Sequence, residues 1–437
     1  MYSPTTIASL LVKLSRAPDL CKPILNSALA FTCLLLGICY HVVLGKSMRI
    51  LLVHNRYQIA GGEDTVVRAE KSMLETHGHE VALLEDDNAD ISGGVGQLRA
   101  GAGAVYSRRG KRRVASELAR FRPAVMHVHN FFPLLSPSIY FAAREAGVAV
   151  VQTLHNYRLV CPNALLFRDG HVCEDCLGAA VPLPGVVHAC YRGSRLATTP
   201  VAAMLVAHRA LNTWKEKVDA YIAFTEFSRQ KMVDGGLPAE KVMVKPNFVH
   251  PSPATGLGEG GYALFVGRLS GEKGLSTLLA AWKQLAAEIP LKIAGDGPLA
   301  DTVRSATKTI PGIEWLGSVP REQVMALMQR AWLLIFPSIV YETFGMSIVE
   351  AFAAGLPVVA SNLGVMASLV RHGQTGLHFR AGDADDLVAQ LRWARSNPAR
   401  VQEMRQRARA EFEMKYTAER NHEMLMDIYK RAVQRAG

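Results

Sequence analysis

The sequence lacks patterns that would assign it to several other classes of protein. No Gly-x-Gly-x-x-Gly follows the first expected strand, residues 49–54, and this absence argues against an enzyme that binds NAD. The densest cationic run, residues 107–113, has no interleaved aromatic side chains, and basic residues alone do not make a nucleic-acid-binding module. We therefore expect neither a dinucleotide cofactor nor a nucleic-acid partner.

Charged residues are missing from residues 24–45. A membrane-spanning helix needs about 20 residues, so this run is long enough for an N-terminal membrane anchor. Polar residues such as Asn26 and His41 weaken its apolar character, and Met48 stands directly before the first expected strand. We favour the interpretation that the extension, residues 1–47, is absent from the mature protein, with the anchor as the alternative. A cleaved signal peptide fits least, because the run is long for the apolar core of such a peptide.

Cysteine is scarce, with 7 in 437 residues, yet four of them fall between residues 161 and 190. Cys161, Cys173, Cys176 and Cys190 have the spacing Cys-x11-Cys-x2-Cys-x13-Cys, and the other three lie in the N-terminal extension. In a reducing compartment a Cys-x2-Cys with flanking cysteines favours a metal site over disulfides. We expect these four to bind a structural zinc ion, with free thiols as the alternative.

The composition fits a globular protein of two domains. With 437 residues, of which 49% are hydrophobic, the chain has enough apolar material for two cores of ordinary size. Its formal net charge of +11 suits nucleic acid, anionic lipid or a phosphorylated substrate, so charge alone does not choose among them.

Strands and helices alternate as in a doubly wound α/β domain from Met48 to residue 250. A helix is expected from Gly61 to about residue 78, and the strands are expected at residues 49–54, 79–84, 124–129, 148–153 and 220–224. Residues 251–261 are rich in Pro, Gly and Ser and are interpreted as a linker. A second α/β domain is expected from residue 262 to residue 410.

The most informative segment is residues 331–360, which is expected to form a strand, a loop, a helix from Met346 and a second strand. A helix that starts at the end of a parallel strand favours an anion through its free N–H groups and its dipole. The turn Thr343-Phe344-Gly345 would hold that anion. Glu350, about one turn into the helix, would accept hydrogen bonds from vicinal ribose hydroxyls, and Glu342 from a second sugar. The alternative is that both glutamates are solvated surface charges.

Two cations are expected over the same anion site. Arg268 follows a strand at residues 262–267, and Lys273 with Gly274 opens the next helix. A further strand ends in the turn Gly295-Asp296-Gly297. Two cations at strand ends match the charge of a diphosphate.

As a set, Gly267-Arg268, Lys273-Gly274, Gly295-Asp296-Gly297 and the paired glutamates resemble glycosyltransferase family 4, the retaining enzymes of the glycosyl transferases group 1. The resemblance runs from Met48 to the C-terminus. It implies the GT-B fold: two doubly wound, Rossmann-like domains that face a cleft, with a C-terminal crossover helix, residues 411–437, returning to the first domain.

The resemblance also implies roles for individual residues. The donor, a nucleoside diphosphate sugar, would be bound through its diphosphate by Arg268 and Lys273 and through its ribose by Glu350. Glu342 would contact the donor sugar as a catalytic residue. The remaining donor-binding positions implied by the resemblance are Gly61, Gly62, Gly295, Phe344, Gly345 and Met346. An ordinary strand-to-helix turn is the alternative for the Gly61-Gly62 pair.

Three histidines end strands in the first half of the chain, His127, His129 and His155, and strand ends in such a sheet face the cleft. His155 matches the cleft histidine of the family, which implies a catalytic position near the donor sugar and the acceptor. We interpret His129 as structural or as facing the acceptor, because buried polar groups are normally paired.

The sequence therefore predicts an enzyme that transfers a sugar to a glycan or lipid-linked acceptor in surface polysaccharide synthesis. No carboxylate stands at a nucleophile position of the family, which favours same-face substitution. The resemblance implies that the diphosphate is bound without a metal cofactor. Another GT-B enzyme such as an epimerase, or a sugar-nucleotide or glycan binding module without activity, are the alternatives. The basic run at residues 107–113, beside an expected helix at residues 114–121, suits an anionic membrane surface, so we expect a cytoplasmic protein peripheral to the inner face of the membrane.

Overall fold

The computed structural model describes residues 47–56, 62–88, 101, 103–285 and 287–437. The chain divides into two units between Met48 and Arg49, and the architecture below is that of the second unit. Nearly all of the predicted N-terminal extension, including its three cysteines, and the predicted site residue Gly61 lie outside the described residues.

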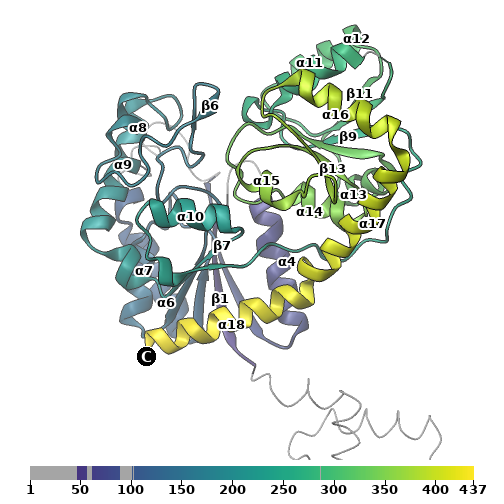
Figure 1. The fold of residues 1–437 in the computed structure, drawn as a ribbon. Coiled ribbons are helices and arrows are strands. Elements are labelled where there is room, and N and C mark those ends of the chain that lie inside the picture. The colour runs from purple at the N-terminus through teal and green to yellow at the C-terminus, as the bar shows by residue number, and fades with distance from the viewer. Residues whose placement is uncertain (1–46, 57–61, 89–100, 102, 286) are drawn as a thin grey trace, which may run out of the picture. The chain divides into compact units, whose positions relative to one another are not determined.

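The first half of the second unit contains a parallel sheet of six strands in the order β2-β1-β3-β4-β7-β8 (Figure 1). Every residue of β3, β4 and β7 is buried, because helices cover a parallel sheet on both faces. Chain order reverses direction between β1 and β3, which is where a doubly wound sheet opens a crevice at the carboxyl ends of its strands. The strands are β1 (Arg49–Arg56), β2 (Glu80–Asp87), β3 (Val125–Val128), β4 (Ala149–Thr153), β7 (Ala220–Ala223) and β8 (Val242–Val244).

The helices of this half are α4 (Gly62–Thr76), α6 (Arg108–Phe121), α7 (Ser138–Glu145), α8 (Leu183–Val187), α9 (Arg195–Ala210) and α10 (Glu226–Asp234). The connection from β4 to β7 is long and includes a short antiparallel hairpin that the sequence did not suggest, β5 (Phe167–Arg168) with β6 (His171–Val172). All four cysteines of the predicted metal site lie in this connection.

The basic run differs from its prediction, since it lies within a helix and not beside one. Ser107 caps α6 by accepting a hydrogen bond from the Gly110 amide at 3.0 Å, so the helix begins at Arg108 and includes the cations. Lys111 forms an ion pair with Glu145, and Arg113 with Asp86. Part of the positive charge of the run is therefore neutralised within the protein.

The second half repeats the architecture with a parallel sheet in the order β11-β10-β9-β12-β13-β14. Its direction reverses between β9 and β12, which places a second crevice at the carboxyl ends of those strands. The strands are β9 (Ala263–Val266), β10 (Leu291–Ala294), β11 (Ile313–Gly317), β12 (Leu333–Phe336), β13 (Val358–Ser361) and β14 (Gly376–Phe379). The helices are α11 (Leu275–Leu285), α12 (Ala300–Thr309), α13 (Arg321–Arg330), α14 (Met346–Ala353), α15 (Gly364–Leu369), α16 (Ala384–Ser396) and α17 (Pro398–Lys415).

The predicted linker, residues 251–261, carries no helix or strand. It is nevertheless held against the second sheet's helices, because the amides of Gly256 and Gly258 donate hydrogen bonds to the carbonyls of Ala354 and Gln329. This connection is thus ordered by its backbone hydrogen bonds and not by side chains of its own.

The predicted crossover helix is confirmed as α18 (Ala418–Ala436), which packs on β3, β4, β7 and α4 of the first half (Figure 1). The Tyr429 hydroxyl lies 2.7 Å from His127 Nδ1, and Arg435 donates to the Asp219 carbonyl. The predicted boundary at residue 411 falls inside α17, which continues to Lys415 before the chain turns.

Each sheet has its own apolar core, so the sequence pattern of two α/β halves is confirmed at the level of the fold. Within the described part of the chain, none of the helices combines the length and apolar character that crossing a bilayer would require.

Candidate active site

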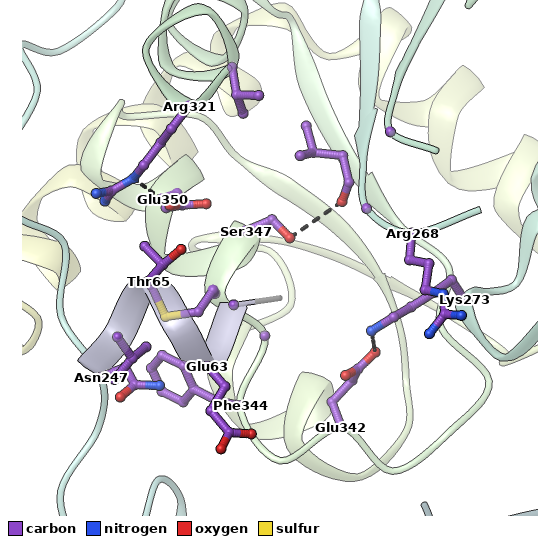
Figure 2. Close-up of a pocket in the computed structure, with 18 of the residues that line it drawn as sticks. Glu63, Thr65, Asn247, Arg268, Lys273, Arg321, Glu342, Phe344, Ser347 and Glu350 are labelled. Carbon is purple, nitrogen blue, oxygen red and sulfur yellow. Dashed lines mark hydrogen bonds and ion pairs between the residues drawn. The ribbon is translucent and has the colours of Figure 1, made fainter. Parts of the chain in front are cut away.

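A pocket of about 850 Å³ opens at the carboxyl ends of the strands of both sheets. Its wall includes residues that follow β1, β4, β9, β10 and β12, and it includes the N-terminal turns of α4 and α14 (Figure 2). This position is the one expected for a ligand site in doubly wound sheets, because free backbone groups and helix N-termini converge there.

The structure brings most of the predicted site residues together in this pocket. Ten of the eleven predicted donor-site and catalytic positions line it, the exception being Gly61, which is not among the described residues: Gly62, His155, Arg268, Lys273, Gly295, Glu342, Phe344, Gly345, Met346 and Glu350. The four cysteines line a different, much smaller cavity.

The N-terminus of α14 points at the pocket. Gly345, directly before the helix, has a φ of 102°, a left-handed conformation that glycine adopts without strain. The amides of Met346 and Ser347 donate to no acceptor within the described residues, whereas the Ile348 amide donates to the Gly345 carbonyl at 3.0 Å. Unpaired amides together with the helix dipole make this turn suited to binding an anion.

Two cations lie near this turn in different states. The Arg268 side chain is exposed and forms no hydrogen bond or ion pair within the described residues. Lys273 Nζ lies 2.7 Å from Glu342 Oε1, which also accepts a hydrogen bond from Ser338 Oγ at 2.6 Å. Arg268 is thus available to an anion, whereas the charge of Lys273 is already balanced by Glu342 (Figure 2).

Glu350 lies deeper in the pocket and pairs with Arg321, the first residue of α13. Arg321 Nε is 3.3 Å from Glu350 Oε1 (Figure 2). Burial raises the pKa of Glu350 above its ordinary value, and the guanidinium of Arg321 offsets part of that effect. Its carboxyl group therefore depends on Arg321 to remain an acceptor of hydrogen bonds.

Gly295 keeps the ends of β9 and β10 close together. It has a φ of 149°, and a Cβ at this position would overlap the carbonyl of Gly267. Any other residue would therefore push away the loop that carries Arg268, which is a structural reason for glycine at this predicted site position.

Two hydrogen bonds join the two halves at the pocket. Thr343 Oγ1 donates to the carbonyl of His155 at 2.9 Å, and the Tyr157 hydroxyl donates to the carbonyl of Glu342 at 3.2 Å. These contacts hold the loop after β4 against the loop before α14, so His155 and Glu342 border the same pocket.

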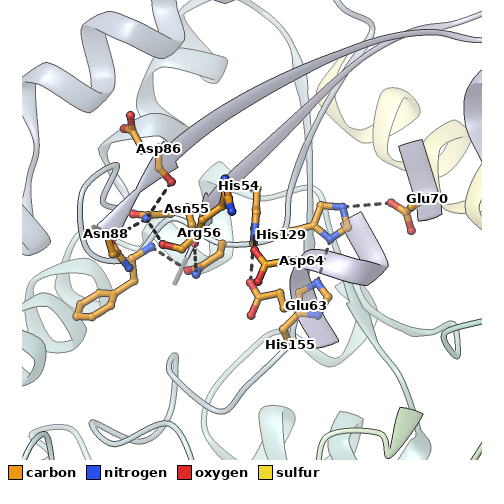
Figure 3. Close-up of polar contacts among 12 residues, drawn as sticks. His54, Asn55, Arg56, Glu63, Asp64, Glu70, Asp86, Asn88, His129 and His155 are labelled. Carbon is orange, nitrogen blue, oxygen red and sulfur yellow. Dashed lines mark hydrogen bonds and ion pairs between the residues drawn. The ribbon is translucent and has the colours of Figure 1, made fainter. Parts of the chain in front are cut away.

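His155 ends a chain of buried polar groups (Figure 3). Its Nε2 lies 2.9 Å from His129 Nδ1, and His129 Nε2 lies 3.2 Å from Glu70 Oε1 on α4. Burial and the neighbouring His127 lower the pKa of His129 to about 4, so His129 is neutral at physiological pH. Burial and His129 likewise lower the pKa of His155 well below its ordinary value.

Glu70 at the other end of this chain is an anion. Burial alone would raise its pKa, but Lys245 and His127 outweigh that effect and hold the pKa well below its ordinary value. Lys245 Nζ lies 3.3 Å from Glu70 Oε2 and donates to Asn421 Oδ1 of α18 at 2.9 Å. A carboxylate only accepts hydrogen bonds, so its 3.2 Å contact with His129 Nε2 favours the tautomer of neutral His129 with the hydrogen on Nε2, in which Nδ1 accepts from His155. The free Nδ1 of His155 is consequently an acceptor.

Glu70, His127 and His129 also place three ligand-type atoms within 4.8 Å of one another, the arrangement that a metal ion needs. Their atoms are already engaged with each other, and the ammonium group of Lys245 lies against the same carboxylate. A cation in this position competes with a metal, so the group is better explained as a buried hydrogen-bond network.

The first turn of α4 contributes an acidic group that the sequence analysis missed. His54 Nε2, at the end of β1, lies 2.9 Å from Asp64 Oδ1, and His54 Nδ1 is 3.7 Å from Glu63 Oε1 (Figure 3). Burial and the charge of Asp64 raise the pKa of Glu63 well above its ordinary value, which favours the neutral form of this carboxyl group in the pocket wall.

Arg321 was also missed, although a signal for it exists in the sequence. It follows Pro320 at the start of a helix that comes after a strand, the same strand-end position that identified Arg268 and Lys273. Glu70 and Lys245 had no such signal, because only the tertiary fold brings α4 next to the end of β8.

Comparisons with known proteins were consistent with this geometry. Residues 60–252 match the sequence model of the family described as Glycosyltransferase Family 4, and residues 254–411 match that of Glycosyl transferases group 1. A glycogen synthase of Mycobacterium tuberculosis is 35% identical over 181 residues, which cover 39% of this chain and 43% of that protein. The sulfoquinovosyl transferase SQD2 of Arabidopsis thaliana is 24% identical over 294 residues, covering 64% of this chain and 51% of that protein. The matches thus span about half the length of these curated relatives.

Solved structures share the fold over most of the chain. HepE of Anabaena, in complex with UDP and glucose, superposes with a TM-score of 0.62 at 18% identity, covering 88% of this chain and 99% of that one. The sucrose-phosphate synthase of Thermosynechococcus elongatus superposes with a TM-score of 0.65 at 16% identity, covering 88% and 98%. The predicted two-domain architecture is confirmed by these likenesses.

Proposed function

Because the chain belongs to glycosyltransferase family 4, with the GT-B fold, we propose that it transfers a sugar from a nucleoside diphosphate sugar to a glycan or lipid-linked acceptor with retention of anomeric configuration. The observation that carries the proposal is the pocket itself, which combines cations and the free amides of α14 with carboxyl groups. A diphosphate flanked by two polyols, ribose and sugar, is the ligand that such a site complements.

In this proposal the diphosphate lies against the Met346 and Ser347 amides with Arg268 and Lys273 on either side. Glu350, whose ionised form Arg321 stabilises, accepts hydrogen bonds from the ribose hydroxyls. Glu342 and His155 contact the transferred sugar, with His155 Nδ1 as an acceptor for one sugar hydroxyl. Gly62 at the start of α4 lets the backbone approach the leaving phosphate from the opposite wall.

The proposed reaction is a same-face substitution. The bond between the anomeric carbon and the phosphate oxygen breaks, the acceptor oxygen bonds to the same face of that carbon, and the acceptor proton passes to the departing phosphate oxygen. Arg268, Lys273 and the dipole of α14 stabilise the negative charge that develops on the diphosphate. No divalent metal is needed for that charge in this mechanism.

The contacts of the nearby carboxyl groups favour this route over a covalent intermediate. A nucleophilic carboxylate needs a free, ionised oxygen in line with the anomeric carbon. The Oε1 atom of Glu342 is engaged by both Lys273 and Ser338, and the raised pKa of Glu63 disfavours its ionised form.

The relatives support an acceptor in envelope or polysaccharide synthesis. Among them are a phosphatidyl-myo-inositol mannosyltransferase of Mycobacterium leprae and the O-antigen chain mannosyltransferase B of Escherichia coli, 33% and 28% identical over their matched segments. The first is named for a lipid acceptor and the second for a polysaccharide. We place the present protein in the same setting, in the cytoplasm at the inner face of the membrane.

Two surfaces of the first half support membrane docking. The α6 arginines, Arg108, Arg109 and Arg112, are exposed and form no ion pair within the described residues. Leu183 on α8 and Leu196 on α9 are apolar and 59% and 87% exposed. Exposed cations attract anionic headgroups, and exposed leucines insert at the acyl boundary.

Cosedimentation of the chain from Met48 with phosphatidylglycerol and phosphatidylcholine vesicles tests this docking. Replacing the three α6 arginines with Ser should weaken binding to the anionic vesicles by about 100-fold, at about 1 kcal/mol per cation. A control triple Ser variant at Arg304, Arg400 and Arg431 should bind as the parent does. Equal loss in both triple variants would mean that only net charge matters and would remove the α6 assignment.

The donor is tested by titrating the protein with UDP, GDP and ADP, and by incubating it with the corresponding sugars. We expect one base to bind clearly and its sugar to be hydrolysed slowly, with the product anomer identified by NMR and with activity unaffected by EDTA. Arg268→Ala and Lys273→Ala should abolish binding, and Lys308→Ala, an exposed cation on α12, should not. Absence of binding to every nucleotide, or epimerised product without transfer, would refute the proposal.

A further inference from the structure

The long connection between β4 and β7 gathers four thiols around one small cavity. Cys161, Cys173, Cys176 and Cys190 all line a cavity of about 10 Å³, and all four are free of disulfides. They come from three separate parts of the connection: the turn after Tyr157, the Cys-x2-Cys segment after β6, and the end of α8. Such a volume accommodates one water molecule or one ion.

The backbone presents the thiols in a manner typical of metal sites. The β5–β6 hairpin leads directly into Cys173, whose amide donates to the Leu166 carbonyl at 2.9 Å. The Leu177 amide then donates to the Glu174 carbonyl at 2.8 Å, which forms a tight turn across the Cys-x2-Cys segment. Both cysteines of the motif line the same cavity.

We propose that Cys161, Cys173, Cys176 and Cys190 bind one Zn²⁺ ion as a tetrahedral thiolate site that holds the connection in its folded form. Four thiolates are the ligand set that selects zinc among the common divalent metals in closed structural sites. A catalytic zinc site keeps a position open for water, whereas this set fills all four.

Binding requires small movements of the side chains. Zn–S bonds of about 2.3 Å set the sulfurs closer together than they are in this structure. Within the described residues, Glu70, His127 and His129 are the only group of three or more ligand-type side chains whose atoms all lie within 4.8 Å of one another. Cys173 and Cys190 are only half-buried and lie on loops, so their side chains are able to rotate inward. Cys161 Sγ, which now donates to Asn163 Oδ1 at 3.0 Å, would give up that bond.

The site lies beside one wall of the proposed active site. Glu174, inside the Cys-x2-Cys segment, forms an ion pair of 2.7 Å with Lys231 of α10. The Lys231 ammonium lies 5.5 Å from the ring centre of Tyr341, the residue before Glu342. Tyr157, four residues before Cys161, donates to the carbonyl of Glu342. A metal that fixes this connection would therefore also fix the loop that carries Glu342.

Metal analysis of the full chain, purified under reducing conditions without chelators, tests the proposal. We expect one equivalent of zinc per chain, which is released when the thiols react with a mercurial. Replacement by cobalt should give the absorption bands of a tetrahedral tetrathiolate. Because both measurements use the unmodified protein, they remain decisive even if a cysteine variant fails to fold.

Matched variants then locate the metal. Cys176→Ser and Cys190→Ser should each lose most of the zinc, whereas replacing Cys21, Cys33 and Cys39 together should leave it in place. The proposal is overturned if the metal-free protein does not bind added Zn²⁺ while all its thiols are reduced, or if mass spectrometry finds a disulfide among the four cysteines. Nucleotide binding by the zinc-free protein separates the outcomes, since loss of zinc with UDP still bound leaves the proposed function intact.

Discussion

At the scale of single residues, the site is organised by pairing of opposite charges that a bound donor would have to rearrange. Lys273 is held by Glu342, and Arg321 by Glu350, so each wall of the pocket pairs one cation with one carboxyl group. Arg268 alone among these residues has no partner within the described residues. The pairs set how strongly the site attracts an anion and how its carboxyl groups titrate.

Glu342→Gln should separate binding from turnover. Removing the carboxylate frees Lys273 for the diphosphate, so affinity for the nucleoside diphosphate should stay the same or rise about 5-fold, the order of one exposed ion pair. Turnover should fall about 100-fold because the sugar loses a charged partner. Calorimetry and a transfer assay measure the two effects, with Lys273→Met as the comparison. If Glu342→Gln weakens nucleotide binding as much as Lys273→Met does, then Glu342 does not compete with the diphosphate for Lys273.

Nucleotide affinity should fall at acid pH through Glu350. Its raised pKa means that the carboxylate becomes protonated at a higher pH than an ordinary glutamate, and a protonated group loses acceptor capacity for the ribose. Arg321→Ala removes the charge that opposes this shift, so the loss of affinity should begin at a still higher pH. This is tested by measuring the dissociation constant of the nucleotide from pH 4.5 to 8 for the parent protein and for Glu350→Gln. The ratio of the two constants at each pH cancels the titration of the diphosphate itself. A ratio that is flat with pH would contradict the assignment.

At the scale of elements, a buried network of an ion pair and a hydrogen bond connects α4, the end of β8 and α18. Glu70 comes from α4, Lys245 follows β8, and Asn421 belongs to α18, so one network connects the pocket wall with the crossover helix. Tyr429 of the same helix contacts His127 beneath the sheet. The orientation of His155 therefore depends on elements that are far apart in the sequence.

Lys245→Met should destabilise the fold more than an ordinary surface change. It leaves the buried carboxylate of Glu70 without its cation, and uncompensated buried charges cost about 3–5 kcal/mol. Adding Glu70→Gln should restore part of the loss, since the orphaned charge is then gone. Denaturant unfolding followed by circular dichroism measures both, with Lys308→Met as the control.

Strictly additive effects in the double variant would show that Glu70 and Lys245 do not interact.

The acid dependence gives a second check. Because the pKa of Glu70 is depressed in the fold, its contribution to stability is present above the ordinary pKa of a carboxyl group and is lost as the pH falls through the lowered value. Glu70→Gln should lack that part of the acid unfolding.

At the scale of the whole molecule, both sheets, the pocket and the crossover helix lie within residues 49–437. We expect a chain that begins at Met48 to keep the unfolding temperature and the nucleotide affinity of the full chain, because it retains every described core strand. Thermal unfolding with and without UDP compares the two. A truncated chain that fails to fold, or that no longer binds the nucleotide, would assign a structural role to residues 1–47.

Local patterns in the sequence were sufficient for the fold and for most of the pocket wall. Apolar runs ending in a glycine or a turn predicted β9, β10 and β12, and strand ends of parallel sheets necessarily meet at one edge. For that reason Arg268, Lys273, Gly295 and Glu350 converge in one pocket as predicted. The basic run was placed wrongly beside a helix, because the cap formed by Ser107 was overlooked.

The sequence alone determined that this protein has two parallel α/β halves, and it predicted an anion site at their strand ends, because the periodicity of apolar residues and the positions of glycine are local properties. Only the tertiary structure decided which charges meet. The Glu70–Lys245 pair spans 175 residues and the Lys273–Glu342 pair spans 69, and no spacing rule predicts contacts across such separations. The raised pKa of Glu350 and the lowered pKa of His155 likewise depend on burial and on the neighbours Arg321 and His129 that only the folded chain brings together.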